Sequence, residues 1–415
     1  MTVGARSLNP FRVLKTHRNF RLFWIGQTLS LIGSWMQTMA LGWLALELSN
    51  SALIVGLVAS VGAIPIVLFS MHAGAFVDRS DRLRLVRITQ SIFLAEALIL
   101  WGVTRLGVVT IPILLLMAVV QGCCSAVEIP ARQSMIIQLV GRDDLQPAIA
   151  LNSSGFNLAR IIGPAIGGVV IHNFGIGWCF ALNAVSYLAV LWGLLLIQLP
   201  VATAAYESLG LADALRDATR NAADGVRHLM QRGPERDLLA LVTVGAVVAG
   251  PFLTLMPVMA RDRLHLGADG YGGLLTSVGI GGLIGALAVA GPASHWRRGR
   301  TLTVTSLLFP VFLLAFACTS NSWVASALLV MTGVAMIMFN ALANGVLQML
   351  VAEEYRGRLM ALYSLLYVGM SQAVGALLVG GLARIIGVAS AIGVCAIATL
   401  AFAAWTARRS NLRAL

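Results

Sequence analysis

Long apolar segments, separated by polar ones, recur along the whole chain and constrain its fold more than any other feature. A helix needs about 20 predominantly apolar residues to cross the hydrocarbon of a bilayer. Twelve segments satisfy this requirement, at 22–46, 53–77, 86–105, 110–130, 148–171, 178–199, 239–260, 272–292, 301–318, 323–350, 359–383 and 386–406. Lipid offers no partner to an unpaired backbone N–H or C=O, so each segment must be helical. The sequence therefore predicts an all-α membrane protein with twelve transmembrane helices.

The composition supports a membrane protein and excludes a soluble one. Hydrophobic residues make up 58% of the chain and charged residues only 11%, whereas soluble domains average about 45–50% and about 25%. The net charge of +12 does not indicate nucleic-acid binding, because the basic residues lie between apolar segments and form no continuous face. The five cysteines lie inside apolar segments without a partner at ligand spacing, which argues against a disulfide framework and a metal site.

The basic residues of the connecting segments are distributed unevenly between the two sides of the predicted membrane. If the N-terminus is cytoplasmic, the outer segments hold only Arg105, Arg261, Arg263 and Arg384, while every basic cluster lies on the inner side. This asymmetry follows the positive-inside rule and predicts that both termini are cytoplasmic. The segment 22–46 is too long for a cleavable signal core, so we expect it to remain as a spanning helix.

One long polar connection divides the predicted helices into six plus six. It covers residues 200–238, where apolar residues at helical spacing predict an amphipathic helix on the cytoplasmic face. The two halves would then be residues 1–199 and 239–415, with no further domain between them.

Two segments at equivalent places in the halves resemble each other. Residues 138–153 and 349–364 align without a gap, and both carry an acidic residue ahead of a matching Ala-Leu pair. Chance similarity is the alternative, since alanine and leucine are abundant in both, but the constant register favours an internal duplication. We therefore expect two pseudo-symmetric six-helix bundles with a site at their interface.

Charge is concentrated between the second and third predicted helices. The residues that define this segment are Gly74, Asp78, Arg79, Arg82 and Arg84. They resemble the loop motif G-x-x-x-D-R-x-G-R-R of the major facilitator superfamily, although Asp81 stands where that family usually has glycine. The resemblance implies the major facilitator fold, transport by alternating access, and a cytoplasmic gate in which an aspartate–arginine contact latches the halves together. An ordinary positive-inside loop is the alternative.

The fifth predicted helix contains a second motif. Its residues are Gly163, Pro164, Gly167 and Gly168. They resemble the G-P-x-x-G-G motif of the drug:proton antiporter branch, and residues 130–133 and 150–160 resemble drug-efflux and siderophore-export members. This resemblance implies export in exchange for protons. Ala118 occupies the place of the family's basic residue in the fourth helix, so proton handling would need other groups.

Ionisable residues inside predicted membrane helices are costly to bury and are therefore functional candidates. The candidates for proton coupling are Glu128, Glu96, Arg132 and Arg160. In the superfamily the first, fourth, seventh and tenth helices line the cavity, which favours Glu128 over Glu96. Structural ion pairs, Glu128 with Arg132 and Glu96 with Arg160, are the alternative.

Amides and aromatic side chains scattered through the predicted helices suit a bulky amphipathic or aromatic solute. The cavity candidates are Gln27, Trp35, Gln37, Gln121, Asn157, Asn340, Asn344, Tyr363, Tyr367 and Gln372. Helix–helix hydrogen bonding is the alternative for each of them. The chain lacks the nucleotide-binding sequence G-x-x-x-x-G-K-[ST], so we expect a proton gradient as the driving force and no cofactor or metal.

Together these features predict a secondary active transporter of the bacterial inner membrane, not an enzyme. It would export a small amphipathic or aromatic solute, such as a drug-like compound or a siderophore, in exchange for protons. We expect the solute, protons and membrane lipid as its partners, no nucleic acid, and a monomer. Proton-coupled uptake and a transporter-derived solute sensor are the alternatives.

Overall fold

The computed structural model describes residues 11–197, 233–291, 297–351 and 353–409. Within these ranges the regular elements are helices and none is a strand. The first half contains α1 (Arg12–Thr16), α2 (Arg18–Ser49), α3 (Ala52–Asp78), α4 (Arg82–Arg105), α5 (Ile111–Val140), α6 (Leu145–Phe174) and α7 (Gly177–Leu195). The second half contains α9 (Gly233–Val244), α10 (Met256–Val258), α11 (Ala268–Ala290), α12 (Arg298–Cys318), α13 (Ser322–Leu350), α14 (Glu353–Ser364), α15 (Ala376–Ile386) and α16 (Val388–Arg409), with irregular helical segments described below.

The predicted linker helix lies almost entirely outside the described residues. Its apolar positions fall within 198–232, which the described ranges leave out. The described chain resumes at Gly233, where α9 begins and continues past residue 238 without interruption. Residues 233–238 are therefore part of the first helix of the second half.

Eleven helical segments in the described ranges are long and apolar enough to cross a membrane. The helix predicted at 86–105 also forms, as the 24-residue α4, but it is not among the eleven. Arginines in its first turns and Glu96 near its centre lower its mean hydropathy. α4 packs against α5 and α7 inside the first half, with Glu96 buried.

Helix ends coincide with residues that stop or cap a helix. Gly141, Gly175 and Gly387 follow α5, α6 and α15 with φ values of 75°, 90° and 84°, a conformation that glycine adopts without a steric penalty. The side chain of Asp81 accepts a hydrogen bond from the backbone N–H of Arg84 and caps α4. These local signals fix the short turns that return the chain into the membrane.

The span predicted at 239–260 is not one regular helix. After α9 it passes through the wide-turned η1 (Gly245–Ala249), the tight-turned η2 (Gly250–Leu253), α10 and the wide-turned η3 (Met259–Arg263). Pro251 and Pro257 lie in this stretch and cannot donate backbone hydrogen bonds. Irregular backbone at membrane depth is tolerated only where protein buries it or a cavity adjoins it.

A second irregular stretch interrupts the span predicted at 359–383. The wide-turned η5 (Leu365–Gly375) joins α14 to α15. Ser60 of α3 donates its hydroxyl to the backbone carbonyl of Ala373 in this segment. Wide turns of this kind shift the register of the side chains that follow and are frequent at functional sites.

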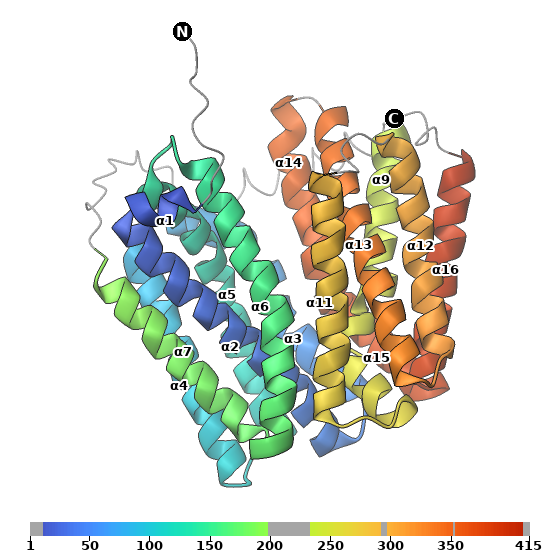
Figure 1. Cartoon of the computed structure of the whole chain (residues 1–415), viewed down its shortest axis with the longest axis horizontal. Helices are drawn as coiled ribbons and strands as arrows, with labels where there is room; N and C mark the ends of the chain where they lie inside the picture. Colours follow the sequence, from blue (N-terminus) through green and yellow to red (C-terminus); the bar gives the residue numbers. More distant parts are fainter. Residues whose placement is uncertain (1–10, 198–232, 292–296, 352, 410–415) are drawn as a thin grey trace.

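The two halves form two groups of helices that lie side by side (Figure 1). α6 packs against α11, and α3 packs against α15 and η5. The groups approach each other at one end of the molecule and separate toward the end that holds α1 and the last turn of α16 (Figure 1). We call the latter the terminal end and the former the distal end.

Contacts between the halves concentrate at the distal end. The rings of Trp43 and Tyr271 stack with their centroids 5.8 Å apart, and Nη1 of Arg261 donates to Oδ1 of Asn50 over 2.8 Å. The largest cluster of buried apolar residues contains members of both halves, whereas two smaller clusters each belong to one half. The core thus joins the halves at the distal end and is divided between them elsewhere.

Candidate substrate cavity

A cavity of about 420 Å³ lies between the two halves. The first half contributes residues of α2, α3, α5 and α6, and the second half contributes residues of η2, α11 and η5 and Thr254. Aliphatic side chains, alanines and glycines dominate its wall. The polar side chains that line it are Trp35, Thr38, Gln121, Ser125, Arg160, Thr254, Tyr271 and Gln372.

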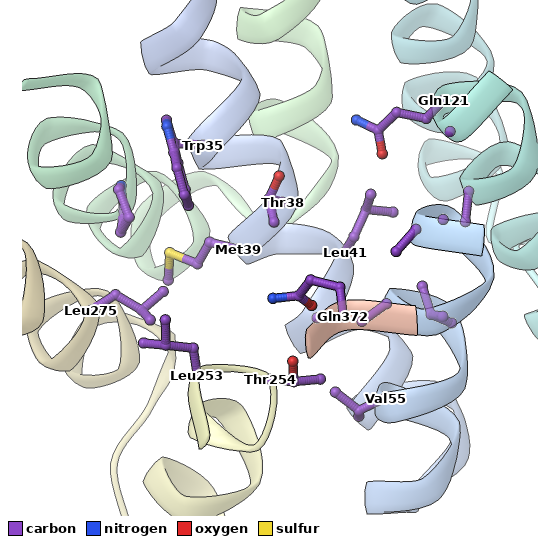
Figure 2. Close-up of a pocket in the computed structure, with 18 of the residues that line it drawn as sticks. Trp35, Thr38, Met39, Leu41, Val55, Gln121, Leu253, Thr254, Leu275 and Gln372 are labelled. Carbon is purple, nitrogen blue, oxygen red and sulfur yellow. The ribbon is translucent and has the colours of Figure 1, made fainter. Parts of the chain in front are cut away.

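Polar groups from opposite sides converge on this space. Figure 2 shows the amide ends of Gln121, on α5, and Gln372, on η5, directed into the region between the halves, with Trp35 and Thr38 of α2 nearby. The irregular segments place two of these groups, because η5 carries Gln372 and the end of η2 leads into Thr254. Few polar groups in an apolar wall fix the orientation of a solute without selecting a densely hydroxylated one.

Three of the ten cavity candidates line this cavity: Trp35, Gln121 and Gln372. Gln27 and Gln37 are buried inside the first half, and Asn157 donates to the backbone carbonyl of Ser153 on its own helix. The side chains of these three residues therefore pack or form hydrogen bonds within the first half, and none of them lines the cavity.

The other four candidates form a separate polar cluster in the second half. Nδ2 of Asn340 donates to the hydroxyl of Tyr367 over 2.6 Å, and the hydroxyl of Tyr363 donates to the backbone carbonyl of Asn340 over 3.3 Å. The two tyrosine rings stack with their centroids 5.6 Å apart. Asn344 accepts a hydrogen bond from Gln348 one turn along α13. This cluster joins α13 to α14 and η5.

Arg160 is the only one of the four proton-coupling candidates that lines the cavity. It lies in α6, one turn before Pro164, which also lines the cavity. Among the described residues no ion pair joins Arg160 to Glu96. The structural ion pair of Glu96 with Arg160, which was the alternative in the sequence analysis, therefore does not form.

Glu96 belongs to a buried hydrogen-bond chain inside the first half. Nε2 of Gln37 donates to its Oε1 over 3.3 Å, and Oε1 of Gln37 accepts from Asn183 over 2.8 Å. Asn183 in turn accepts from the hydroxyl of Ser186 over 2.9 Å. Within the described residues the second carboxyl oxygen of Glu96 has no hydrogen-bond partner. This hydrogen-bond chain connects α2, α4 and α7, and its members other than Glu96 are neutral side chains.

Glu128 and Arg132 form a buried ion pair on α5. Nε of Arg132 lies 2.9 Å from Oε1 of Glu128, although the N–H bond is not aligned well enough for a hydrogen bond. Nε2 of Gln90 also donates to Glu128, over 3.4 Å. Both charged residues are buried between α4 and α5 and neither lines the cavity. The geometry brings Glu128 and Arg132 together, as their spacing suggests.

The three glycines of the α6 motif face in two directions. A Cβ atom on Gly163 would lie 2.6 Å from Cβ of Trp35, so glycine allows α2 to approach closely. Gly167 also faces α2, at Met36 and Met39. Gly168 instead faces α11, where an added Cβ would lie 3.0 Å from Cα of Asp269. The motif therefore packs α6 within its own half and against the other half.

The gate residues lie at the terminal end, where α3 meets α4. Arg79 follows the last residue of α3, and Arg82 and Arg84 lie in the first turn of α4. Gly74 lies in the last turns of α3 with open space where a Cβ would be. The side chain of Asp78 lies outside the described residues, so the predicted aspartate–arginine contact stays a prediction.

Sequence reasoning missed several side chains of the cavity, including Thr38, Thr254 and Tyr271. The sequence did contain a signal that could have indicated Thr254 as a cavity residue. Pro251 and Pro257 lie in one predicted span, and two prolines in a span indicate a broken helix near a binding site. Nothing in the local sequence distinguishes Thr38 or Tyr271 from residues that only pack between helices.

Comparison with protein families gives one match that covers nearly the whole chain. Residues 5–415 match the family described as "Transmembrane secretion effector". Among curated relatives, the staphyloferrin A transporter of Staphylococcus aureus is 26% identical over 71% of this chain and 72% of its own length. The multidrug efflux pump Tap of Mycolicibacterium fortuitum is 24% identical over 80% and 82%, and macrolide efflux protein A of Streptococcus pyogenes is 22% identical over 83% and 84%.

Solved structures share the fold at low sequence identity. A bacterial homologue of the human lysosomal transporter Spinster, in an inward-facing and occupied conformation, superimposes with a TM-score of 0.70 at 14% identity, covering 98% of this chain and 99% of that one. The nucleoside transporter NupG superimposes with a TM-score of 0.66 at 16% identity, covering 94% and 98%.

Proposed function

The chain belongs to the family of transmembrane secretion effectors within the major facilitator superfamily, and from this premise we propose that it exports a small amphipathic or aromatic solute across the bacterial inner membrane. The cavity shared by the two halves carries this proposal, because a predominantly apolar wall with a few amides and hydroxyls suits such a solute. Relatives named for the transport of staphyloferrin A and for efflux of drugs and macrolides support the same class.

Alternating access is the mechanism that we propose for this export. Twelve spans in two bundles of six would pivot about the shared cavity, with α4 as the twelfth span beside the eleven most apolar ones. The contacts between the halves lie at the distal end, which fits a state that admits solute from the terminal end. Both chain termini would then be cytoplasmic, in agreement with the distribution of arginines.

Exchange for protons would drive the cycle. Burying an ionised carboxyl group is costly unless a cation accompanies it. Glu128 has Arg132 beside it, whereas the one hydrogen bond that the described residues give Glu96 comes from the neutral amide of Gln37. Glu96 is therefore the residue that we propose as the proton carrier, with Glu128 as the second candidate.

Accumulation of solute in cells tests the proposed export. Cells that overproduce the chain are compared with empty-vector cells for a panel of aromatic dyes, a macrolide and siderophores. We expect lower accumulation of at least one compound, and we expect an uncoupler to abolish the difference. Higher accumulation would support uptake instead. Equal accumulation of every compound would contradict transport and leave a sensor.

Paired substitutions test the proton carrier. In proteoliposomes, Glu96→Gln should abolish efflux driven by a pH gradient while exchange of labelled for unlabelled solute continues, because exchange requires no net proton movement. Glu128→Gln serves as the matched variant and should retain the response to the gradient. Loss of that response in Glu128→Gln alone would assign the proton to Glu128.

A further inference from the structure

Among the described residues, Arg160 is the only one with a charged side chain in the wall of the cavity. The residues that the structure assigns to that wall include no aspartate and no glutamate. A cation in an apolar cavity at membrane depth is costly unless an opposite charge or a ligand accompanies it. Arg160 nevertheless lies in a cavity that is lined by residues of both halves.

No acidic residue of the described chain compensates this charge. Glu96 takes its hydrogen bond from Gln37, and Glu128 is paired with Arg132. Within the described part of the chain, Nη2 of Arg160 is buried and has no hydrogen-bond partner.

The position of the guanidinium group is set by close packing between the halves. A Cβ atom on Gly282 of α11 would lie 2.5 Å from Nη2 of Arg160. Glycine at this place leaves room for the end of the arginine side chain beside the second half. The positive charge of Arg160 therefore lies where α6 contacts α11, beside the cavity that both halves line.

From this arrangement we infer that the cavity recognises the anionic group of an amphipathic solute, with Arg160 as its ligand. A carboxylate, sulfonate or phenolate in the cavity would accept charge-assisted hydrogen bonds from the guanidinium group of Arg160. The apolar part of the solute would lie against Trp35, Met39 and Leu275, which face the same space (Figure 2). The inference rests on the proposed transport function and narrows its substrates to amphipathic anions.

Two fluorescent probes with the same ring system test this inference. Anilinonaphthalene sulfonate carries a negative charge, and N-phenylnaphthylamine lacks it. Binding of each probe to the full chain in lipid nanodiscs is measured by titration, after subtraction of the signal from empty nanodiscs. The wild-type chain should bind the sulfonate about tenfold more tightly than the neutral probe, which corresponds to about 1.4 kcal/mol.

Substitutions of Arg160 and of Gly282, which packs against it, test whether Arg160 causes the preference for the sulfonate. Arg160→Gln should bring the two affinities within about twofold of each other while the neutral probe still binds, which also shows that the variant is folded. Arg160→Lys should keep part of the preference. Gly282→Ala retains the charge but displaces the guanidinium group, and it should weaken binding of the sulfonate alone. Arg105→Gln, at an exposed arginine outside the cavity wall, is the charge-matched control and should change neither affinity.

The outcomes separate the inference from the proposed function. Equal affinities of the wild-type chain for both probes, or a preference that persists in Arg160→Gln, would overturn the anion site and leave export of neutral solutes intact. Failure of the wild-type chain to bind either probe would count against the cavity as a site for aromatic solutes and against the inference together.

Discussion

At the scale of single residues, the four proton-coupling candidates fall into three different situations. Glu128 and Arg132 neutralise each other, Glu96 is surrounded by neutral hydrogen-bonding groups, and Arg160 faces a cavity. The sequence identified all four as candidates from their cost in lipid, but it could not assign these situations. Which helix faces which neighbour depends on packing, and the partner of each charge follows from that packing.

The buried pair on α5 predicts a pattern of stabilities. Arg132→Leu leaves Glu128 without its cation, and Glu128→Leu leaves Arg132 without its anion, so each should reduce the stability of the purified chain by about 3–5 kcal/mol. The double variant should unfold at a higher temperature than either single variant, because it leaves no unpaired charge. Thermal unfolding in detergent provides the measurement.

An exposed ion pair serves as the control for this comparison. Nε of Arg261 lies 2.7 Å from Asp262 at the distal end, where both side chains are partly exposed. Asp262→Asn should change stability by less than about 1 kcal/mol. A double variant of the α5 pair that is less stable than both single variants would show that the pair itself stabilises the fold.

At the scale of helices, the close contact between α6 and α11 predicts the effect of two neighbouring glycines. A Cβ atom on Gly272 would lie 2.5 Å from the backbone carbonyl oxygen of Pro164, whereas one on Gly273 would meet open space. Gly272→Ala should therefore separate the halves at the distal end, and Gly273→Ala should leave them in contact. Labelling of a cysteine at Thr38, in the wall of the cavity, by a membrane-impermeant reagent added at the distal side measures the difference.

The labelling requires a background in which the five native cysteines are replaced. In that background Gly272→Ala should increase the labelling rate at least about threefold, whereas Gly273→Ala should match the parent chain and gain up to about 1 kcal/mol of helix stability. Equal rates in the two variants would show that the contact of α6 with α11 does not close the distal end.

The helices themselves were largely predictable from the apolar pattern. The predicted span 323–350 corresponds to α13 (Ser322–Leu350) and 301–318 corresponds to α12 (Arg298–Cys318). Lipid forces helical hydrogen bonding, so the number of apolar residues fixes each span. Helices such as α5 (Ile111–Val140) continue well beyond the apolar segment predicted at 110–130, because polar residues also sustain a helix once its backbone bonds have begun.

The irregular segments and the cavity were less predictable. The wide turns of η1, η3 and η5 have no consistent sequence signal, and they shift which side chains face inward. Seven of the ten cavity candidates, including Asn340 and Tyr363, do not line the cavity between the halves. Some of them form hydrogen bonds inside the protein instead, between helices for Asn340 with Tyr367 and within one helix for Asn157, and the sequence cannot separate these roles from contact with a solute.

At the scale of the whole molecule, alternating access predicts that a link across the distal end stops transport. Nη1 of Arg261 and Oδ1 of Asn50, from opposite halves, are 2.8 Å apart. Cysteines at these two positions, joined by a short reducible cross-linker, should hold the halves together and abolish efflux, and reduction should restore it. His17 and Asp144, whose side chains approach to 2.9 Å inside the first half, provide the matched pair. Cross-linking them should leave efflux unchanged, because both residues move with one bundle. Efflux that continues with the distal pair fully cross-linked would rule out a pivot that opens this end.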